Sequence, residues 1–263
     1  MKPVLFAHRG ARKERPENTL VAFRHALDLG ADALELDVHF TRDRVVVVHH
    51  DPTLSRSSGL PVAIRDVDWP ALSQVDVGHT FRDERGQIPF AGTRMPRLVD
   101  VLDELQGIPL NVDLKPESPA LCQAVLALLR ARKATESVRL ASFSNRNLAL
   151  VRRLGYEGET SFGPRGVMLL ASGGRLLLRP LGEVAQAAQI PTHYGRLRLD
   201  TPRFVREVRR AGAKLHYWTI NEPKEAERLL ALGADGLVTD DVRALKPVFE
   251  AFGSGVSGSF RDL

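Results

Sequence analysis

Cysteine is almost absent from this chain of 263 residues, because Cys122 is the only one. A single cysteine excludes an intramolecular disulfide and a zinc site built from cysteine ligands. Any metal site must therefore use carboxylates and histidines. No apolar run approaches the ~20 residues that cross a bilayer, and the N-terminus lacks the apolar core of a signal peptide. We therefore expect a cytoplasmic protein without stable membrane insertion.

Neither sign of charge is in large excess, since 37 basic residues face 32 acidic ones and leave a net charge of +5. Lysine is scarce, because only 7 of the basic residues are lysine. The basic residues are scattered along the chain, which does not favour a nucleic-acid interface. An arginine-favouring codon bias explains this composition, and the alternative is attraction of anionic substrates, since arginine binds phosphate oxygens through a planar fork. Charge alone does not decide between them.

Apolar runs and helical patterns alternate along the chain, and this order favours a parallel sheet wrapped by helices. About eight strands in a chain of this length predict a closed (β/α)8 TIM barrel. The predicted strands are 4–8, 33–40, 45–49, 110–114, 138–143, 160–162, 189–193, 214–220 and 236–239. The predicted helices are 17–29, 99–105, 120–132, 148–154, 183–188, 204–211, 224–232 and 243–251.

The segment 51–97 departs from this rhythm because it is rich in proline and has little periodicity. Long irregular segments in a compact domain are often functional. We predict a small insertion after the second strand, above the mouth of the barrel. The whole chain is expected to form a single barrel domain over 1–252, followed by a flexible C-terminal tail at 253–263.

Acidic residues are predicted at strand ends, where barrel enzymes carry their active sites. Glu35 and Asp37 are two positions apart on one strand, so their side chains share a face. Two carboxylates on one face repel each other, and a hard divalent cation such as Mg²⁺ or Ca²⁺ relieves this repulsion. Asp113 could supply a third carboxylate. The alternative is that these acids form salt bridges with arginines.

Two histidines, His8 and His50, also lie at strand ends. A histidine pair can divide the roles of general acid and general base near neutral pH. Arg9 and Lys115 add positive charge at the same end of the barrel. Together with a metal ion, they would form a clamp for phosphoryl oxygens. The residues alone thus indicate a metal-assisted phosphate-ester enzyme, although a single histidine is more often structural.

Two sequence blocks carry a resemblance to a known family. They read HRGARKERPENTLVAF and ELDVHFTRDRVVVVHHDPTLSR. These blocks resemble the glycerophosphodiester phosphodiesterase family, whose pattern is HRG…PENT followed by E-x-D…T-x-D…H-D. The later motifs NVDLK, YWTIN and GLVTD follow in the expected order. The similarity spans about residues 4 to 243.

The resemblance implies a (β/α)8 barrel that hydrolyses a small glycerophosphodiester to sn-glycerol 3-phosphate and an alcohol. The implied site comprises metal ligands Glu35, Asp37 and Asp113, an acid–base pair of His8 and His50, and substrate-binding residues Arg9, Lys115 and Trp218. The metal ion would be Mg²⁺ or Ca²⁺. Asp113 departs from the family, which usually has the longer glutamate there.

Two other functions compete with this interpretation. A lysophospholipase D-like activity on lipids would need an apolar channel or docking surface, and the insertion offers Trp69, Phe81 and Phe90. A non-catalytic barrel should lack a histidine or an acid of the site, yet His8, His50, Glu35 and Asp37 are all present. Apolar surface on the outer helices is compatible with a homo-oligomer.

Overall fold

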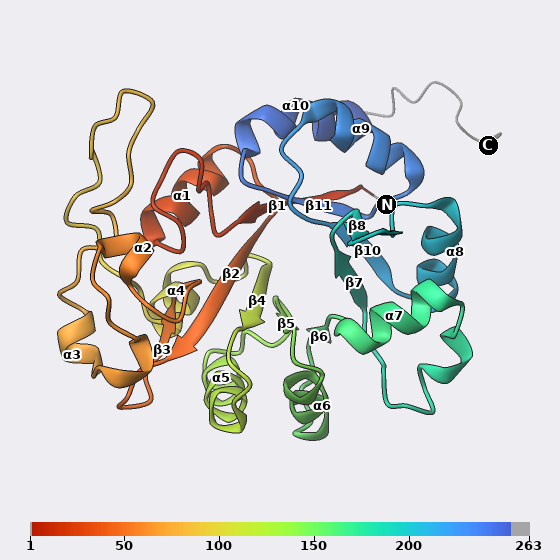
Figure 1. Ribbon diagram of the computed structural model, residues 1–263, viewed down its shortest axis with the longest axis horizontal. Helices are drawn as coiled ribbons and strands as arrows, with labels where there is room; N and C mark the ends of the chain where they lie inside the picture. The colour runs from red at the N-terminus through yellow and green to blue at the C-terminus, as the bar shows by residue number, and fades with distance from the viewer. Residues whose placement is uncertain (1, 254–263) are drawn as a thin grey trace.

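Parallel strands alternate with helices around a central barrel in the computed structural model, which describes residues 2–253 (Figure 1). The barrel strands are β1 (Val4–His8), β2 (Ala33–Phe40), β4 (Leu110–Leu114), β5 (Val138–Ala141), β6 (Glu159–Thr160), β7 (Ala187–Ile190), β10 (Lys214–Tyr217) and β11 (Gly236–Thr239). The predicted tail lies outside the described residues, apart from Gly253 at the end of the last helix.

The strand order is β6-β5-β4-β2-β1-β11-β10-β7, and every neighbouring pair on this path is parallel. A single parallel bridge between Ser161 and Ala187 connects the ends of this path. The eight strands therefore form a nearly closed (β/α)8 barrel, which confirms the predicted fold class.

Helices cover the outside of the barrel. They are α1 (Leu20–Asp28), α4 (Leu98–Glu104), α5 (Pro119–Ala131), α6 (Asn145–Arg153), α7 (Pro164–Ser172), α8 (Pro202–Arg210), α9 (Pro223–Leu232) and α10 (Val242–Gly253). Several begin at a hydroxyl cap: Thr19 accepts from the backbone N–H of Ala22, and Ser118 from that of Leu121. Such caps satisfy N–H groups that have no partner within the helix.

The insertion follows β3 (Val46–Val48), which pairs antiparallel with β2. It contains α2 (Ser55–Ser58), the 3₁₀ turn η1 (Ile64–Asp66) and α3 (Trp69–Leu72), seen in orange beside the barrel in Figure 1. A small apolar cluster holds it together, comprising Val47, Leu54, Ile64, Leu72, Val77 and Met95. The insertion thus packs around a core separate from that of the barrel.

The predicted helix at 183–188 is wrong, because Ala187 and Ala188 belong to β7. Burial alternates from Glu183 through Ala185 to Ala187, which is the period of extended chain. The alanines favour a helix in isolation, but barrel packing overrides that preference. The structure also contains elements that the sequence patterns did not predict: α7, the turn η2 (Arg175–Leu177), and a hairpin of β8 (His193–Tyr194) and β9 (Leu197–Arg198).

Within residues 2–253, no helix combines the length and apolar character needed to cross a bilayer.

Candidate active site

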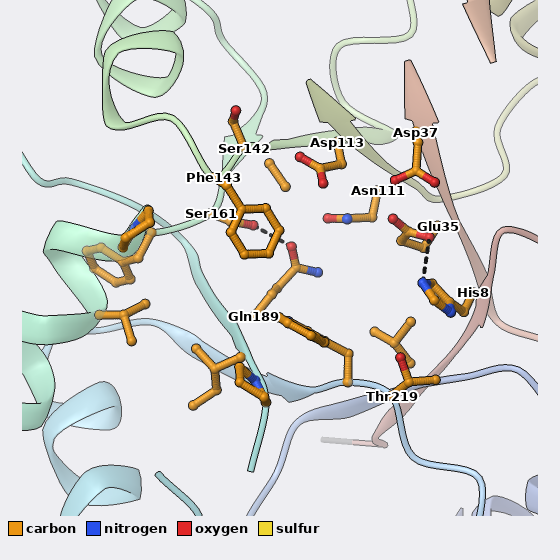
Figure 2. Close-up of a pocket in the computed structure, with 18 of the residues that line it drawn as sticks. His8, Glu35, Asp37, Asn111, Asp113, Ser142, Phe143, Ser161, Gln189 and Thr219 are labelled. Carbon is orange, nitrogen blue, oxygen red and sulfur yellow. Dashed lines mark hydrogen bonds and ion pairs between the residues drawn. The ribbon is translucent and has the colours of Figure 1, made fainter. Parts of the chain in front are cut away.

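A cavity of about 600 Å³ lies at the carboxyl ends of the barrel strands (Figure 2). All eight residues that the sequence predicts for the site line this one cavity. They are His8, Arg9, Glu35, Asp37, His50, Asp113, Lys115 and Trp218. They come from segments separated by as many as two hundred residues, so the closed barrel is what brings them together.

The register of β2 against β4 arranges the acidic residues. Glu35 is paired with Asn111, and Asp37 with Asp113. Parallel neighbours in register project side chains to the same face, so these four polar groups point into the cavity together (Figure 2). All four are buried, with Asp37 only 1% exposed.

Two cationic side chains contact the carboxylates. Lys115 Nζ lies 2.8 Å from Asp37 Oδ1 and 2.7 Å from Asp113 Oδ2. Arg9 Nε lies 3.2 Å from the second oxygen of Asp37, and the backbone N–H of Arg9 donates to Glu35 Oε2 at 3.1 Å. The backbone of Arg9 is left-handed at φ 54°, and Gly10 follows at φ 80°. A Cβ at Gly10 would meet the backbone of Ala22 at 2.7 Å, so the tight turn after β1 requires glycine.

These two cations do not fully compensate three buried acids. Burial raises the pKa of Glu35 well above its usual value, and the charges of Asp37 and Asp113 raise it further. Burial also raises the pKa of Asp113. For Asp37, burial acts in the same direction, but the charges of Lys115 and Arg9 prevail and lower the pKa. The site therefore has an excess of negative groups.

Each of the two predicted catalytic histidines is held by an aspartate. His8 Nδ1 donates to Asp240 Oδ1 and His50 Nδ1 donates to Asp51 Oδ1, both at 2.6 Å. Burial would raise the pKa of Asp240, yet the hydrogen bond and charge of His8 lower it, so the ionised carboxylate accepts. Because Nδ1 is used in this way, Nε2 is the nitrogen of each ring that can exchange a proton with a substrate. His8 Nε2 lies 3.9 Å from Glu35 Oε2 (Figure 2).

Comparison with known proteins assigns the chain to a family. The sequence model of the glycerophosphoryl diester phosphodiesterase family matches residues 8–244. The chain belongs to this family. It is accordingly a phosphoric diester hydrolase, and the similarity supports glycerophosphodiester phosphodiesterase activity.

Relatives match over nearly their whole length. A glycerophosphodiester phosphodiesterase of Caldanaerobacter subterraneus is 29% identical, with 93% of this chain and 97% of that protein covered. A lysophospholipase D of Rattus norvegicus is 30% identical, with 91% of this chain and 84% of that protein covered. A solved structure from Silicibacter pomeroyi, assigned as a glycerophosphoryl diester phosphodiesterase, is 27% identical with a TM-score of 0.78, covering 96% of this chain and 95% of that one.

The donor chemistry of this phosphodiesterase site fits a hard divalent cation. Within the described residues, no group of three histidine, cysteine, aspartate or glutamate side chains is arranged as a metal site. Lys115 and Arg9 instead form ion pairs with Asp37. The donors are nevertheless all oxygens, as Mg²⁺ and Ca²⁺ prefer. Asn111 Oδ1 and Asp113 Oδ1 are buried acceptors without a hydrogen-bond donor among the described residues. A cation would satisfy both oxygens and the excess negative charge.

Three polar residues of the phosphodiesterase site were not predicted as members of it. Asn111 precedes Asp113 by two positions, so the strand period could have revealed it. Asp240 is visible in sequence only as a polar residue after the last strand, because its partner His8 is 232 positions away. Arg12 lines the cavity and lies 3.3 Å from Glu17 and 3.6 Å from Asp240.

Proposed function

We propose that the chain hydrolyses glycerophosphodiesters to sn-glycerol 3-phosphate and an alcohol, with His8 and His50 as the acid–base pair and with a divalent cation. The observation that carries this proposal is the pair of histidine–aspartate contacts at 2.6 Å, both beside the same cavity as the buried acids. Two matched histidines are what a reaction needs when one oxygen must lose a proton and another must gain one.

Arginine and lysine side chains are positioned to bind the phosphate. Arg9 and Arg12 both line the cavity, and Glu17 fixes them, with Arg9 Nη1 donating to its carboxylate at 3.0 Å. Burial opposes ionisation of Glu17, but the hydrogen bond from Arg56 and the nearby guanidinium charges lower its pKa to about 2. Glu17 therefore stays ionised at neutral pH and keeps both guanidinium groups oriented for the phosphoryl oxygens.

Either histidine can serve in either half of the proton transfer. A neutral ring whose Nδ1–H is held by aspartate has a lone pair on Nε2, which can take the proton of the attacking water. A protonated ring instead carries a proton on Nε2, which it can donate to the oxygen of the leaving alcohol. Asp240 and Asp51 stabilise the charged ring in either case, and such proton transfers contribute about 10²- to 10⁴-fold to rates.

Glu35, Asp37 and Asp113 would hold the cation, with the amide oxygen of Asn111 as a further neutral donor. When bound, a divalent ion neutralises charge that develops on phosphoryl oxygens. Lys115 lies between two of the same carboxylates and would direct its own charge toward the phosphate. The side chain of Asp113 is shorter than the family glutamate, and Asn111 beside it offers an oxygen that can compensate.

The test uses the full chain after EDTA treatment, with glycerophosphocholine as substrate and coupled detection of glycerol 3-phosphate. Activity should return with Mg²⁺ or Ca²⁺. His8→Ala and His50→Ala should each lower turnover about 10²-fold or more while the fold is retained. His25→Ala is the matched control, because His25 also contacts a carboxylate, at 2.8 Å from Glu14, but does not line the cavity.

Near-normal turnover in a folded His8 or His50 variant would refute the role of that residue. Full activity in EDTA would refute the dependence on metal. Release of phosphocholine and glycerol, in place of choline and glycerol 3-phosphate, would refute the proposed bond cleavage.

A further inference from the structure

Gln189 is a polar side chain of the cavity to which the proposed reaction gives no role. It belongs to β7 and extends into the cavity, with its amide nitrogen on the side of Glu35 and His8 (Figure 2). Along the barrel, β7 is four strands away from β2, which carries Glu35, in either direction. In a barrel of eight strands, Gln189 therefore lies across the cavity from the proposed metal ligands.

Two neighbours fix the orientation of the Gln189 amide. Ser161 Oγ donates to Gln189 Oε1 at 2.6 Å, and Gln189 Nε2 lies 3.5 Å from His216 Nδ1. Burial and the charge of Arg139 lower the pKa of His216 well below its usual value, so this ring is neutral. Arg139, which can only donate, lies 3.4 Å from the same Nδ1 and identifies that nitrogen as the acceptor. The amide oxygen of Gln189 therefore faces the serine, and its nitrogen faces the histidine.

The residues that hold the amide are themselves fixed. Ser161 is 2% exposed and His216 is fully buried. Behind His216, the guanidinium of Arg139 donates through Nε to the carboxylate of Glu159 at 3.0 Å. A side chain that is already ordered before binding loses little conformational freedom when a ligand arrives. Gln189 is thus a preorganised polar group in the cavity.

Part of the hydrogen-bonding capacity of the Gln189 amide is left for a substrate. A primary amide has two N–H donors, and its oxygen has two acceptor positions. Ser161 uses one acceptor position, and His216 uses one donor. The remaining donor and acceptor belong to a group that extends into the cavity, so Gln189 can donate to an alcohol hydroxyl or accept from one.

The mouth of the cavity has a different character. Phe143, Met168 and Tyr194 line it as apolar residues with exposed fractions of 65%, 50% and 73%. The head group differs between glycerophosphodiesters, whereas the glycerol part is common to all of them. An open mouth tolerates a variable group, and a partly buried amide of fixed orientation suits the constant one. The aromatic residues of the insertion, which the sequence suggested for lipid contact, are absent from the described lining: Trp69, Phe81 and Phe90.

We propose that Gln189 determines specificity for the glycerol part of the substrate by hydrogen bonding to its terminal hydroxyl. The hydroxyl on the middle carbon is nearer to phosphorus and stays beside the histidines and the proposed cation. The terminal hydroxyl extends one carbon further and needs a partner of its own, because a hydroxyl withdrawn from water is costly unless it is hydrogen-bonded. This inference rests on the proposed function, because it assumes that the phosphodiester lies beside the histidines.

A purely structural role is the competing interpretation of Gln189. Its contacts with Ser161 and His216 connect β7 to the neighbouring segments of the barrel, and such contacts stabilise a barrel whether or not a substrate binds. The two roles differ in one respect. Only a residue that touches the substrate can distinguish two substrates that differ by one hydroxyl.

The experiment compares glycerophosphocholine with 2-hydroxypropyl phosphocholine of matching configuration, which lacks only the terminal hydroxyl. Both release choline, so one choline-oxidase assay measures both substrates. The wild type should lose about 10- to 100-fold in kcat/KM on the analogue, because the amide of Gln189 is then left without its partner. The analogue keeps the middle hydroxyl, so any part which that group takes in the reaction is the same for both substrates.

Gln189→Met removes the amide and keeps most of the side-chain volume. It should lower kcat/KM for glycerophosphocholine by about 10- to 100-fold and leave the analogue within about twofold of the wild type. Ser161→Ala releases the amide oxygen and should reduce the ratio between the two substrates by a smaller factor. Gln186→Met is the matched control, because Gln186 also contacts β6, accepting from the backbone N–H of Thr160 at 2.8 Å, but does not line the cavity. It should keep the wild-type ratio.

Binding alone provides a second measurement. Calorimetry with sn-glycerol 3-phosphate and with 2-hydroxypropyl phosphate should show weaker binding of the second ligand to the wild type, by about 10- to 100-fold. Gln189→Met should bind both ligands equally. This comparison needs no turnover, so it separates recognition of the hydroxyl from any effect on the reaction.

Equal hydrolysis of both substrates by the wild type would overturn this inference and leave the proposed function intact. An equal loss on both substrates in Gln189→Met, with their ratio unchanged, would assign the residue to the support of the barrel and also overturn the inference. If Gln189→Met does not fold, an unchanged ratio in Ser161→Ala has the same consequence. No choline release from glycerophosphocholine with any metal, from folded wild type, would overturn both proposals.

Discussion

Replacing Lys115 with methionine should destabilise the protein without metal, and added metal should reverse much of that loss. Lys115 is 19% exposed, and its partners Asp37 and Asp113 are 1% and 8% exposed as side chains. Removing one partner of a buried ion pair costs about 3–5 kcal/mol, because the remaining charges have no compensation. Methionine keeps most of the aliphatic volume, so the change isolates the charge.

In EDTA, the free energy of unfolding of Lys115→Met should therefore fall by about 3–5 kcal/mol. At about 2–4 °C per kcal/mol for a chain of this size, Tm should drop by about 6–20 °C. Lys2→Met is the matched control, because Lys2 is 55% exposed and pairs with Asp32 at the surface. Exposed pairs contribute only about 0–1 kcal/mol. Denaturant unfolding followed by circular dichroism measures both variants.

Excess Mg²⁺ or Ca²⁺ should then stabilise the variant more than the wild type, because a cation can replace the missing charge beside Asp37 and Asp113. A ligand at about 100 times its Kd stabilises the folded state by about 2.7 kcal/mol. A variant as stable as the wild type in EDTA would refute the role of Lys115 as a buried counter-charge. Equal metal effects on both proteins would refute the proposal that metal and Lys115 share these carboxylates.

Three further predictions concern single residues of the site. Asp240→Asn should lower kcat about 10²-fold with little change in KM, because an amide no longer stabilises the charged ring of His8; steady-state kinetics with near-normal kcat would contradict this. Asn111→Leu should weaken divalent-ion affinity by about tenfold in calorimetry. It should not lower the free energy of unfolding, because Asn111 Oδ1 accepts no hydrogen bond that the substitution would remove. The pKa of Glu17 is lowered from 4.5 to about 2. The ionised carboxylate therefore adds roughly 3 kcal/mol to the free energy of unfolding above pH 4.5, and this stabilisation is lost as the pH falls toward 2. Acid unfolding curves should show this loss, and Glu17→Gln should be less sensitive to pH in that range.

The sequence predicted the strands of the reaction site closely because each is short, buried and regular. The predicted ranges for β1, β2, β4 and β11 agree with the structure at both ends. In β2, the two-residue period separates apolar side chains from the acidic ones. This fixed period is a property of any extended strand, so the spacing of Glu35 and Asp37 is enough to place both side chains on one face.

Contacts between distant segments could not be predicted in the same way. Asp240 meets His8 because β11 pairs in parallel with β1, with Ala7 opposite Thr239. Local patterns carry no information about which strands become neighbours when the barrel closes. The same holds for the Lys115 contact with Asp37, which depends on the pairing of β4 with β2.

Most of the apolar residues that line the cavity, unlike Trp218, were not predicted, for a different physical reason. Val167 and Met168 lie on α7, and Tyr194 and Leu197 lie on the β8–β9 hairpin, within the part of the chain where the predicted elements were wrong or absent. These segments connect the strands of the barrel and are not themselves paired in its sheet. Strand register therefore places no constraint on which residues they contain. The barrel strands must keep their polar groups in register for the reaction, whereas the connections can change without disturbing it. Substrate preference should therefore depend on the connecting segments, and the chemistry on the strands.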